Sequence, residues 1–346
     1  MGKIKVALIF GGETPEHEVS VLSAKSVINH IDKDKYKVIP IGISKNGIWQ
    51  TPEETDKVIK NDLQIIPENG GNNISKSLIA FLKEKIDVIF PLIHGPNGED
   101  GKLQGFFELI NIPYVGTGVL SSAIGMDKAF MKKIFSYNGI NQGEFLILTY
   151  EEYQEYSIKE IINSVLTNTD FPCFVKPANM GSSIGITKVD KPVNLNKAFG
   201  KAFEFDNKII VEEFIDGREI ECSVLGNTDI KASVPGEIIA SNDYYDYEAK
   251  YKDDNTELII PAPLDKNTIN NIQNTAEKVF KAVDGRGFAR IDFFIIDQEG
   301  KSEIFVNEIN TIPGFTRYSM YPKLWEESGI SYPDLIDQLI QLAFEK

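Results

Sequence analysis

Two strand-like motifs late in the chain carry polar side chains that suit a magnesium site. FARIDFF contains Arg290 and Asp292, and FVNEIN contains Glu308 and Asn310. Because alternate residues of a strand point to the same face, each pair is expected to share one face of its strand. Two carboxylates and an amide oxygen, completed by phosphate oxygens, match the ligands of Mg²⁺. A strand pair with one face in water would explain the alternation but not the arginine beside the acids, so we favour metal-assisted phosphoryl transfer.

A loop of small residues follows a lysine in the segment FVKPANMGSSIGI, residues 174–186. Small residues let the backbone approach phosphate oxygens closely, and Lys176 supplies a positive charge beside them. The expected order is strand, loop, strand, without the GxxxxGK[ST] pattern of a P-loop. A plain hairpin turn would look the same, so the loop by itself leaves a phosphate site and a simple turn equally open.

The same loop contains the pattern GxSxG around Ser183, which surrounds the nucleophilic serine of many hydrolases. That arrangement needs a helix after the serine and a histidine later in the chain. Here a strand-like run follows, and the three histidines, His17, His30 and His94, all come earlier. The hydrolase hypothesis therefore fails on both requirements.

Three further turns are candidate ligand sites. NTIPGFT, residues 310–316, places the Gly314 N–H beside the expected metal site, where it could bind an oxyanion, although a simple turn would look the same. GGETPEHEVS places Glu16 and Glu18 at a predicted helix start, where acids also complement the helix dipole; for Glu18 we prefer that interpretation. HGPNGEDG places His94 at the end of a strand, which is a weak signal alone.

The elements that must position these residues begin with a β-α-β pattern. Three apolar runs, residues 5–10, 36–43 and 86–93, alternate with helical patterns in the first ~120 residues. This rhythm predicts an open parallel sheet, in which ligands lie at the carboxyl ends of the strands.

The length of 346 residues predicts two or three domains. We expect an N-terminal α/β domain over residues 1–121, a central domain over 122–212 and a C-terminal domain over 213–346. The C-terminal domain contains the segment 241–256, which is rich in tyrosine and charge. A loop of that length is uncommon unless it is functional or disordered, so we expect a mobile loop near the site.

Composition indicates a globular protein without nucleic-acid or membrane partners. The 51 acidic and 36 basic residues give a net charge of −15, which repels phosphate backbones but allows a small anionic substrate in a basic cleft. No apolar stretch approaches the ~18 residues of a membrane span, and the first residues do not resemble a signal peptide. We therefore expect a cytoplasmic protein. Cys173 and Cys222 lie in apolar strand-like runs and are expected to be core residues.

With these motifs in place, the sequence resembles the D-alanine–D-alanine ligases of the ATP-grasp superfamily. Eight motifs follow the family's order over essentially the whole chain: GGETPEHEVS, HGPNGEDG, MDK, VKPANMGSSIG, VEEFIDGREI, YYDYEAKY, ARID and NEINTIPGFT. Any one of them is a weak signal, but eight in order are highly specific. The resemblance implies an α/β, three-domain ATP-grasp architecture with an N-terminal open parallel (pre-ATP-grasp) domain, in which ATP lies between the second and third domains.

The resemblance also implies roles for individual residues. Those near ATP are Lys128 and Lys176 at the phosphates, Ser182 and Ser183 in the small-residue loop, Glu212, Glu213 and Ile215 near the adenine, Glu219 at the ribose, and Lys250. Those near two Mg²⁺ or Mn²⁺ ions are Asp292, Glu308 and Asn310. Those near the substrates are Glu16 at the first D-alanine, Ser182 and Tyr251 bonded with it to close the loop, Arg290 and Gly314 at the oxyanion, and His94, Lys250, Ser319 and Met320.

The activity that the resemblance implies is ATP-dependent joining of two D-alanine molecules through an acyl phosphate, for cell-wall synthesis. Sister ligases that take D-serine or D-lactate second, and carboxylase-type relatives, share the ATP machinery; YDYEAKY favours the dipeptide-forming branch. A non-catalytic nucleotide-binding regulator is disfavoured because it would have no oxyanion for Arg290 to bind. Lys102 and Met180 depart from the commonest family pattern, at positions without a catalytic role. The resemblance implies a homodimer and leaves a need for K⁺ undecided.

Overall fold

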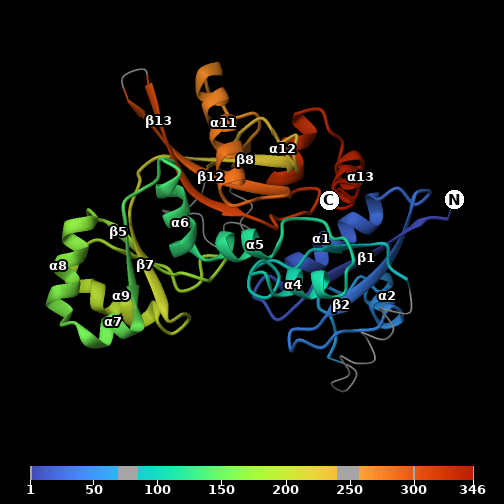
Figure 1. Cartoon of the computed structure of the whole chain (residues 1–346), viewed down its shortest axis with the longest axis horizontal. Helices are drawn as coiled ribbons and strands as arrows, with labels where there is room; N and C mark the ends of the chain where they lie inside the picture. Colours follow the sequence, from blue (N-terminus) through green and yellow to red (C-terminus); the bar gives the residue numbers. More distant parts are fainter. Residues whose placement is uncertain (1, 69–84, 240–256, 299–300, 346) are drawn as a thin grey trace.

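The computed structural model describes residues 2–68, 85–239, 257–298 and 301–345, and within these ranges the chain forms three sheets (Figure 1). The N-terminal sheet is parallel, in the order β2-β1-β3, which confirms the prediction from the three apolar runs. Residues 6–10 of β1 are fully buried, as expected for a central strand covered on both faces. The elements are β1 (Ile4–Gly11), α1 (His17–His30), β2 (Tyr36–Ile43), α2 (Pro52–Lys60), β3 (Val88–Pro91), α4 (Lys102–Leu109) and α5 (Val119–Met126).

The central part of the chain folds around an antiparallel sheet in the order β4-β7-β5-β6. Strands β5 and β6 pair with each other on either side of the small-residue loop, so the predicted order of strand, loop and strand is confirmed. Ser157 and Glu160 form a capping box at the start of α8. The elements are α6 (Lys128–Tyr137), β4 (Phe145–Thr149), α7 (Tyr150–Glu155), α8 (Ile158–Asn168), β5 (Cys173–Pro177), β6 (Thr187–Val189), the 3₁₀ helix η1 (Pro192–Asn194), α9 (Leu195–Ala202) and β7 (Lys208–Glu213).

The C-terminal sheet is antiparallel, in the order β11-β10-β8-β12-β13, with β9 paired to β8. Its two long strands, β12 and β13, are the predicted motif strands. Asp265 caps α11, whose apolar stripe packs against this sheet. The elements are β8 (Arg218–Gly226), β9 (Lys231–Ala232), β10 (Gly236–Ile239), β11 (Glu257–Ile259), α11 (Lys266–Ala282), β12 (Gly287–Gln298), β13 (Lys301–Asn310), α12 (Met320–Glu327) and α13 (Tyr332–Leu342).

The two ends of the chain share one hydrophobic core. The last helix, α13, buries Leu335, Ile336, Leu339 and Ile340 in the same cluster as the inner face of β1. Figure 1 shows this helix, in red, beside the blue N-terminal sheet. The hydroxyl of Tyr36 at the start of β2 donates to Asp337 of α13, which adds a polar contact at the edge of this core. The hydrophobic core of the N-terminal part is therefore completed by the end of the chain.

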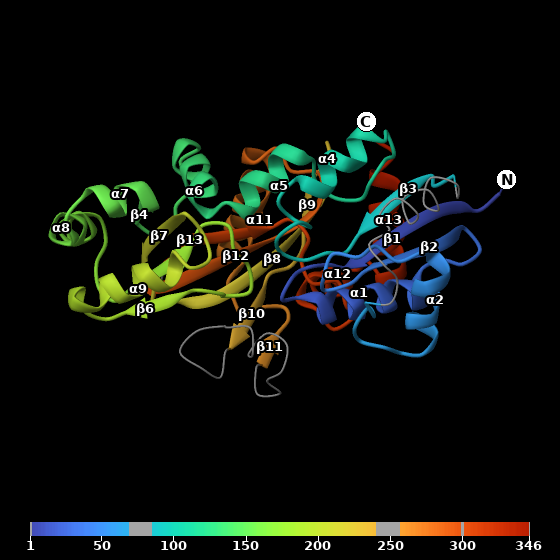
Figure 2. The same ribbon diagram turned by 90° about the horizontal axis from the view of Figure 1, so that it is seen from below.

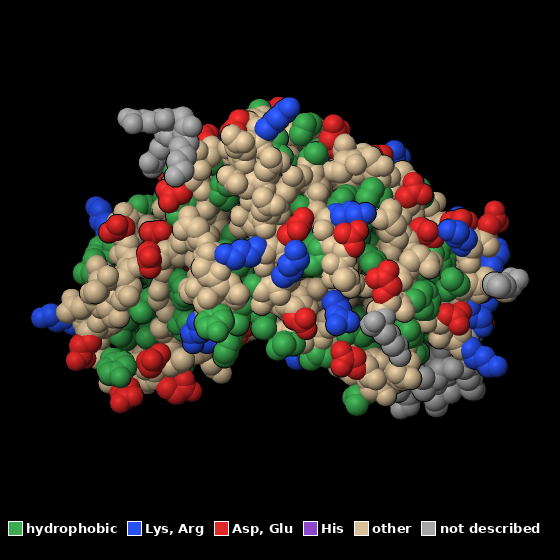
Figure 3. Space-filling view, turned by 45° about the horizontal axis from the view of Figure 1, so that its top comes forward, with side chains coloured by type: hydrophobic (Ala, Val, Ile, Leu, Met, Phe, Trp, Pro, Cys, Tyr) green, Lys and Arg blue, Asp and Glu red, His purple; other side chains and the backbone are tan. Residues whose placement is uncertain are grey.

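The central and N-terminal parts lie at opposite ends of the molecule, with the C-terminal sheet over both (Figure 1); β10 and β11 project from that sheet in Figure 2. On the face drawn in Figure 3, acidic and basic side chains are interspersed. No helix of the described residues is long and apolar enough to cross a membrane. Cys173 and Cys222 are buried and unpaired, which confirms their prediction as core residues.

Candidate active site

One cavity of about 660 Å³ collects residues from the N-terminal, central and C-terminal parts of the chain. Every predicted site residue within the described ranges lines it. Lys250 and Tyr251, together with the segment 241–256, lie outside the described residues. The predicted residues along the cavity wall are Glu16, His94, Lys128, Lys176, Ser182, Ser183, Glu212, Glu213, Ile215, Glu219, Arg290, Asp292, Glu308, Asn310, Gly314, Ser319 and Met320.

The strand pair β12–β13 brings the two predicted polar pairs together. Its register sets Arg290 opposite Asn310 and Asp292 opposite Glu308. Arg290 donates from Nε and Nη2 to the two carboxylate oxygens of Asp292, at 2.7 and 2.8 Å. Asn310 Nδ2 donates to the same carboxylate at 2.9 Å. The shared face expected from strand alternation is therefore confirmed, and side-chain hydrogen bonds hold it together.

Arg290 also contacts a carboxylate that the sequence reasoning missed. Glu221 lies opposite Asp292 on the neighbouring strand β8, and its Oε2 is 3.0 Å from Arg290 Nε. The guanidinium therefore lies between two carboxylates that are largely removed from solvent. The sequence did contain a signal, because Glu219 and Glu221 alternate along a strand and must share a face.

The acids of this wall fit a divalent cation by the chemistry of their oxygen atoms. Asp292 and Glu308 are cross-strand neighbours, and Asn310 presents its amide beside them. The described residues contain no group of three or more His, Cys, Asp or Glu side chains placed to hold a metal. A site built from two carboxylates and one amide oxygen needs further oxygens from phosphates or water, which is how Mg²⁺ is usually held.

Lys176 and Lys132 share one buried carboxylate. Glu212, only 4% exposed, forms ion pairs with Lys176 and, at 2.6 Å, with Lys132, which is 3% exposed. Burial alone would raise the pKa of Glu212, but the two lysines outweigh it and hold this pKa at about 2. Burial would likewise lower the pKa of Lys176, but Glu212 and Glu308 raise it above its usual value. The sequence reasoning missed Lys132, although it lies four residues after Lys128 on one helix face.

Lys128 connects the small-residue loop to the acids of β13. It is the first residue of α6, which Asp127 caps through the N–H groups of Ala129 and Phe130. Its Nζ donates to the Met180 carbonyl at 2.9 Å and lies 3.5 Å from Glu308 Oε2. Both predicted phosphate lysines therefore face the cavity while paired with carboxylates, and a phosphate group would compete with those carboxylates.

The small-residue loop has an unusual backbone. Ser182 and Ser183 adopt left-handed φ values of 53° and 58°, and Gly185 has φ of 74°. Serine rarely takes this conformation, and strain of this kind concentrates at functional sites. The Ser182 hydroxyl is buried and has no hydrogen-bond partner among the described residues. These features favour a ligand loop over a plain hairpin turn.

Glu16 reaches the cavity from the start of α1, where it is the residue before His17 and is 9% exposed. A Cβ atom added to Gly95 would lie 3.2 Å from Glu16 Oε2, and one added to Gly181 would lie 3.6 Å from it. Glu16 therefore faces both the HGPNGEDG loop, which contains Gly95, and the small-residue loop of the central part, which contains Gly181. The hydrogen bond predicted between Glu16 and Ser182 is not formed in this structure, because the buried Ser182 hydroxyl has no partner among the described residues, so the set of Glu16, Ser182 and Tyr251 stays a prediction.

His94 makes its hydrogen bonds within the protein. Its Nδ1 lies 2.8 Å from the Ile312 carbonyl, and its Nε2 lies 3.4 Å from the Ser23 hydroxyl. Burial lowers the pKa of His94, although Glu16 opposes the shift, so the ring is neutral at pH 7. Its predicted contact with substrate therefore stays a prediction.

The turn that carries Gly314 follows β13 directly. A Cβ atom added to Gly314 would lie 3.1 Å from Ser319 Oγ, so the turn lies against the start of α12. Ser319 accepts a hydrogen bond from the Thr316 N–H at 3.1 Å and contacts the Thr316 hydroxyl at 2.8 Å. The Gly314 N–H, Ser319 and Met320 thus line one end of the cavity together.

Glu99 also lines this end of the cavity and was not singled out from the sequence. Burial, and secondarily the nearby charge of Glu16, raise the pKa of Glu99 to about 8. It belongs to the HGPNGEDG segment, where acids can equally serve a surface turn, so the sequence offered no clear signal.

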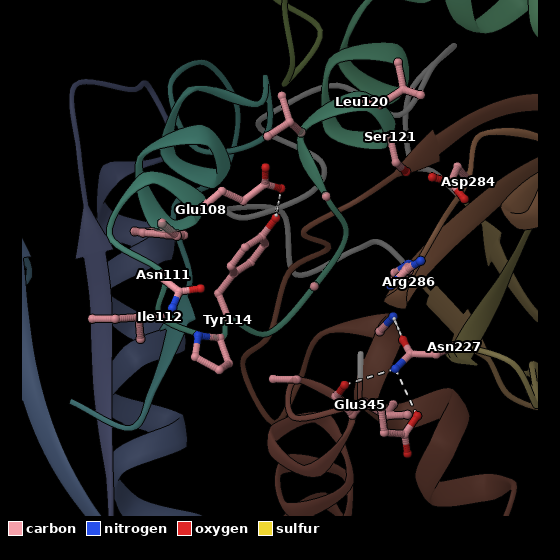
Figure 4. A pocket seen from close by; sticks show the side chains of 18 residues that line it. Glu108, Asn111, Ile112, Tyr114, Leu120, Ser121, Asn227, Asp284, Arg286 and Glu345 are labelled. Carbon is pink, nitrogen blue, oxygen red and sulfur yellow. Dashed lines mark hydrogen bonds between the residues drawn. The ribbon is translucent and has the colours of Figure 1, made fainter.

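A second cavity of about 660 Å³ lies between the N-terminal part and the C-terminal end of the chain (Figure 4). Figure 4 shows Glu108 and Tyr114 on one side of it and Arg286 and Asn227 on the other. Tyr114 donates to Glu108 at 2.9 Å, and Asn227 donates to Glu345 at 3.0 Å. None of the predicted site residues lines this cavity within the described ranges.

The active-site cavity defines a class of enzyme. Lysines paired with acids, carboxylates on adjacent strands, and an arginine that lines the same cavity as the Gly314 backbone suit phosphoryl transfer to a carboxylate followed by acyl transfer. Two family models match the chain: D-ala D-ala ligase N-terminus over residues 5–117, and D-ala D-ala ligase C-terminus over residues 134–341. The chain belongs to the D-alanine–D-alanine ligase family and is an enzyme of the ligase class.

Individual relatives agree with this membership. A D-alanine–D-alanine ligase of Halothermothrix orenii is 53% identical over 345 residues, covering 100% of this chain and 99% of the relative. The solved D-alanine–D-alanine ligase of Coxiella burnetii is 36% identical, with a TM-score of 0.81 over 99% of this chain and 94% of that one. A solved D-Ala:D-Ser ligase of Enterococcus faecalis is also 36% identical, with a TM-score of 0.82 over 99% and 100% of the two chains. The fold predicted from the resemblance is thereby confirmed.

Proposed function

We propose that this chain joins two D-alanine molecules into D-alanyl-D-alanine, using ATP and releasing ADP and phosphate. The observation that carries the proposal is the convergence of the lysines, the strand-pair acids and Arg290 on one cavity. Relatives of 45–53% identity over the whole chain are named D-alanine–D-alanine ligase, which supports D-alanine over D-serine as second substrate.

The first step would activate the carboxylate of the first D-alanine. A carboxylate is a poor acyl donor, so one of its oxygens attacks the γ-phosphorus of ATP. The bond from this phosphorus to the bridging oxygen of ADP breaks, ADP leaves, and an acyl phosphate is formed. Glu16 would bind the substrate ammonium, while Lys128 and Lys176 would exchange their carboxylate partners for phosphate oxygens. Divalent cations, two Mg²⁺ or Mn²⁺ when bound at Asp292, Glu308 and Asn310, would neutralise charge on the phosphates.

The second step would form the peptide bond. The neutral amine of the second D-alanine attacks the acyl carbon, and phosphate leaves with the electrons of the broken C–O bond. Arg290 and the Gly314 N–H would stabilise the oxyanion of the tetrahedral intermediate. Ser319 and Met320 would lie beside the second substrate.

The remaining assignments extend this proposal. Glu212, Glu213, Ile215 and Glu219 would meet the adenosine part of ATP, and Ser182 and Ser183 its phosphates. Lys250 and Tyr251 keep the roles that the resemblance implies. We also propose a cytoplasmic homodimer, which sedimentation of the purified protein would test.

The test is phosphate release from ATP and Mg²⁺ with different amino-acid pairs. D-Alanine alone should drive turnover and yield D-alanyl-D-alanine, whereas L-alanine should not. Turnover that needs added D-serine or D-lactate would keep the ATP site but overturn the second-substrate assignment. If no amino-acid pair led to phosphate release, the proposed reaction would be overturned.

A further inference from the structure

Ile312 precedes Gly314 by two residues, and side chains of the N-terminal part bind both its backbone N–H and its backbone carbonyl. The Ile312 N–H donates to Glu99 Oε1 at 2.7 Å. The Ile312 carbonyl lies 2.8 Å from His94 Nδ1, which must be the donor because a carbonyl only accepts. Ile312 belongs to the C-terminal part, and Glu99 and His94 belong to the N-terminal part, 213 and 218 residues away.

The second carboxyl oxygen of Glu99 binds a backbone group within the N-terminal part. Glu99 Oε2 accepts the Gly95 N–H at 2.9 Å. Gly95 follows His94 directly, has φ of 75° and lies against Glu16. One carboxylate therefore joins the loop that borders the first substrate site to the turn that carries Gly314.

The position of this contact gives it a consequence for catalysis. Ile312 lies two residues before Gly314, and Pro313 between them leaves little backbone freedom. Whatever fixes both polar groups of Ile312 therefore sets where the Gly314 N–H points. An oxyanion donor acts only when it is aimed at the place where charge develops, and a misplacement of about 1 Å can cost roughly 100-fold in rate.

We propose that Glu99 is a positioning residue for acyl transfer, which holds the Gly314 N–H in place through the Ile312 N–H and does not itself contact substrate. This inference rests on the proposed function. Under this inference, the N-terminal part would both bind the first substrate and position the oxyanion donor. The competing explanation is that Glu99 only stabilises the fold where the two parts meet.

The test compares Glu99→Gln with wild type, because glutamine keeps the size but can accept only one of the two N–H groups. We expect kcat to fall ~10- to 100-fold, with KM for ATP changed less than ~2-fold, because the nucleotide lysines are untouched. We also expect more than one phosphate released per dipeptide formed, since an acyl phosphate that waits for the amine is hydrolysed by water. A stabilising role alone would lower the melting temperature and leave this ratio at the wild-type value.

Glu108→Gln is the matched control, because Glu108 lies in the same part of the chain, accepts a side-chain hydrogen bond and lines only the second cavity. It should keep the wild-type kcat and phosphate-to-dipeptide ratio. Should Glu99→Gln not fold, Glu99→Asp keeps the carboxyl group but is too short to reach both N–H groups, and the same rise in the ratio is expected. An unchanged kcat and ratio in a folded Glu99 variant would overturn the inference while wild-type turnover upholds the function. Wild-type protein inactive with D-alanine would overturn both.

Discussion

The two cavities described above have the same volume, about 660 Å³ each, but the charged side chains on their walls differ in how deeply they are buried. In the active-site cavity, Glu212 and Lys132 form an ion pair although both are less than 5% exposed. In the second cavity, the charged residues Asp284 and Arg286 are exposed to solvent. Removing charges from water costs several kcal/mol per ion, so a chain keeps them buried only where they are paired and useful. Volume alone would not have separated the two cavities, whereas the buried ion pairs do.

The largest change in stability should come from a substitution that breaks the buried ion pairs of the active-site cavity. Glu212→Gln would leave Lys132 and Lys176 facing each other without their shared carboxylate. We expect the free energy of unfolding to fall by about 3–5 kcal/mol, as is usual when one partner of a buried pair is removed. Chemical denaturation would measure it. Glu213→Gln is the matched control, since its carboxylate is only partly buried and accepts one backbone N–H. Equal losses in the two variants would contradict the special role of Glu212.

Arg290→Ala should abolish turnover while leaving ATP binding largely intact. Removing one oxyanion donor typically costs ~100- to 1000-fold in kcat, and here the two carboxylates beside the guanidinium would also lose their counter-ion. Phosphate release would report turnover, and calorimetric titration with ATP and Mg²⁺ would report binding. If binding fell as far as turnover, Arg290 would belong to the nucleotide site instead.

Lowering the pH should decrease the stability of the folded protein through the carboxylate of Glu212. The pKa of Glu212 is about 2 in the folded protein and ~4.3 for an unperturbed glutamate. The folded pKa is the lower one, so the unfolded chain binds the proton first, and stability is lost as the pH falls from ~4.5 towards 2. The loss amounts to roughly 3 kcal/mol. Denaturation at several pH values should show a flatter dependence for Glu212→Gln than for wild type; identical slopes would count against the shift.

The smallest effect on turnover and stability should come from a substitution in the second cavity. Arg286→Ala removes an exposed side chain that makes no ion pair in the described part of the chain. We expect kcat within about twofold of wild type and stability within ~0.5 kcal/mol, as for most surface substitutions. Steady-state kinetics and thermal melting would check this. A loss of turnover comparable to that of Arg290→Ala would erase the distinction between the two cavities.

Local patterns predicted what local geometry determines. The alternation in FARIDFF and FVNEIN was enough to place Arg290 with Asp292, and Glu308 with Asn310, on one face of each strand, because strand periodicity is a property of neighbouring residues. The contact between Glu99 and Ile312 could not be predicted in this way, because it depends on how two distant loops meet. Their separation of 213 residues leaves no periodic trace.

The ion pairs of the active site could be predicted in part from the sequence. Lys128 and Lys176 came from the motifs, but their carboxylate partners depend on the packing of β13 against α6 and on the pairing of β5 with β7. Lys132 could have been found from its spacing to Lys128, and Glu221 from its spacing to Glu219. The domain boundaries at residues 121 and 212 stay a prediction.

The core shared by β1 and α13 has a consequence for how this protein is made. Ribosomes release a chain from its first residue, so β1 emerges more than 300 residues before Leu335 and its neighbours. Until then, the apolar face that α13 will cover stays open to water, where exposed apolar surface promotes aggregation. The N-terminal sheet is thus synthesised first and completed last, and a chaperone that shields it during translation would act on this face. A nascent chain arrested before residue 332 should accordingly be held by such a chaperone longer than the finished protein.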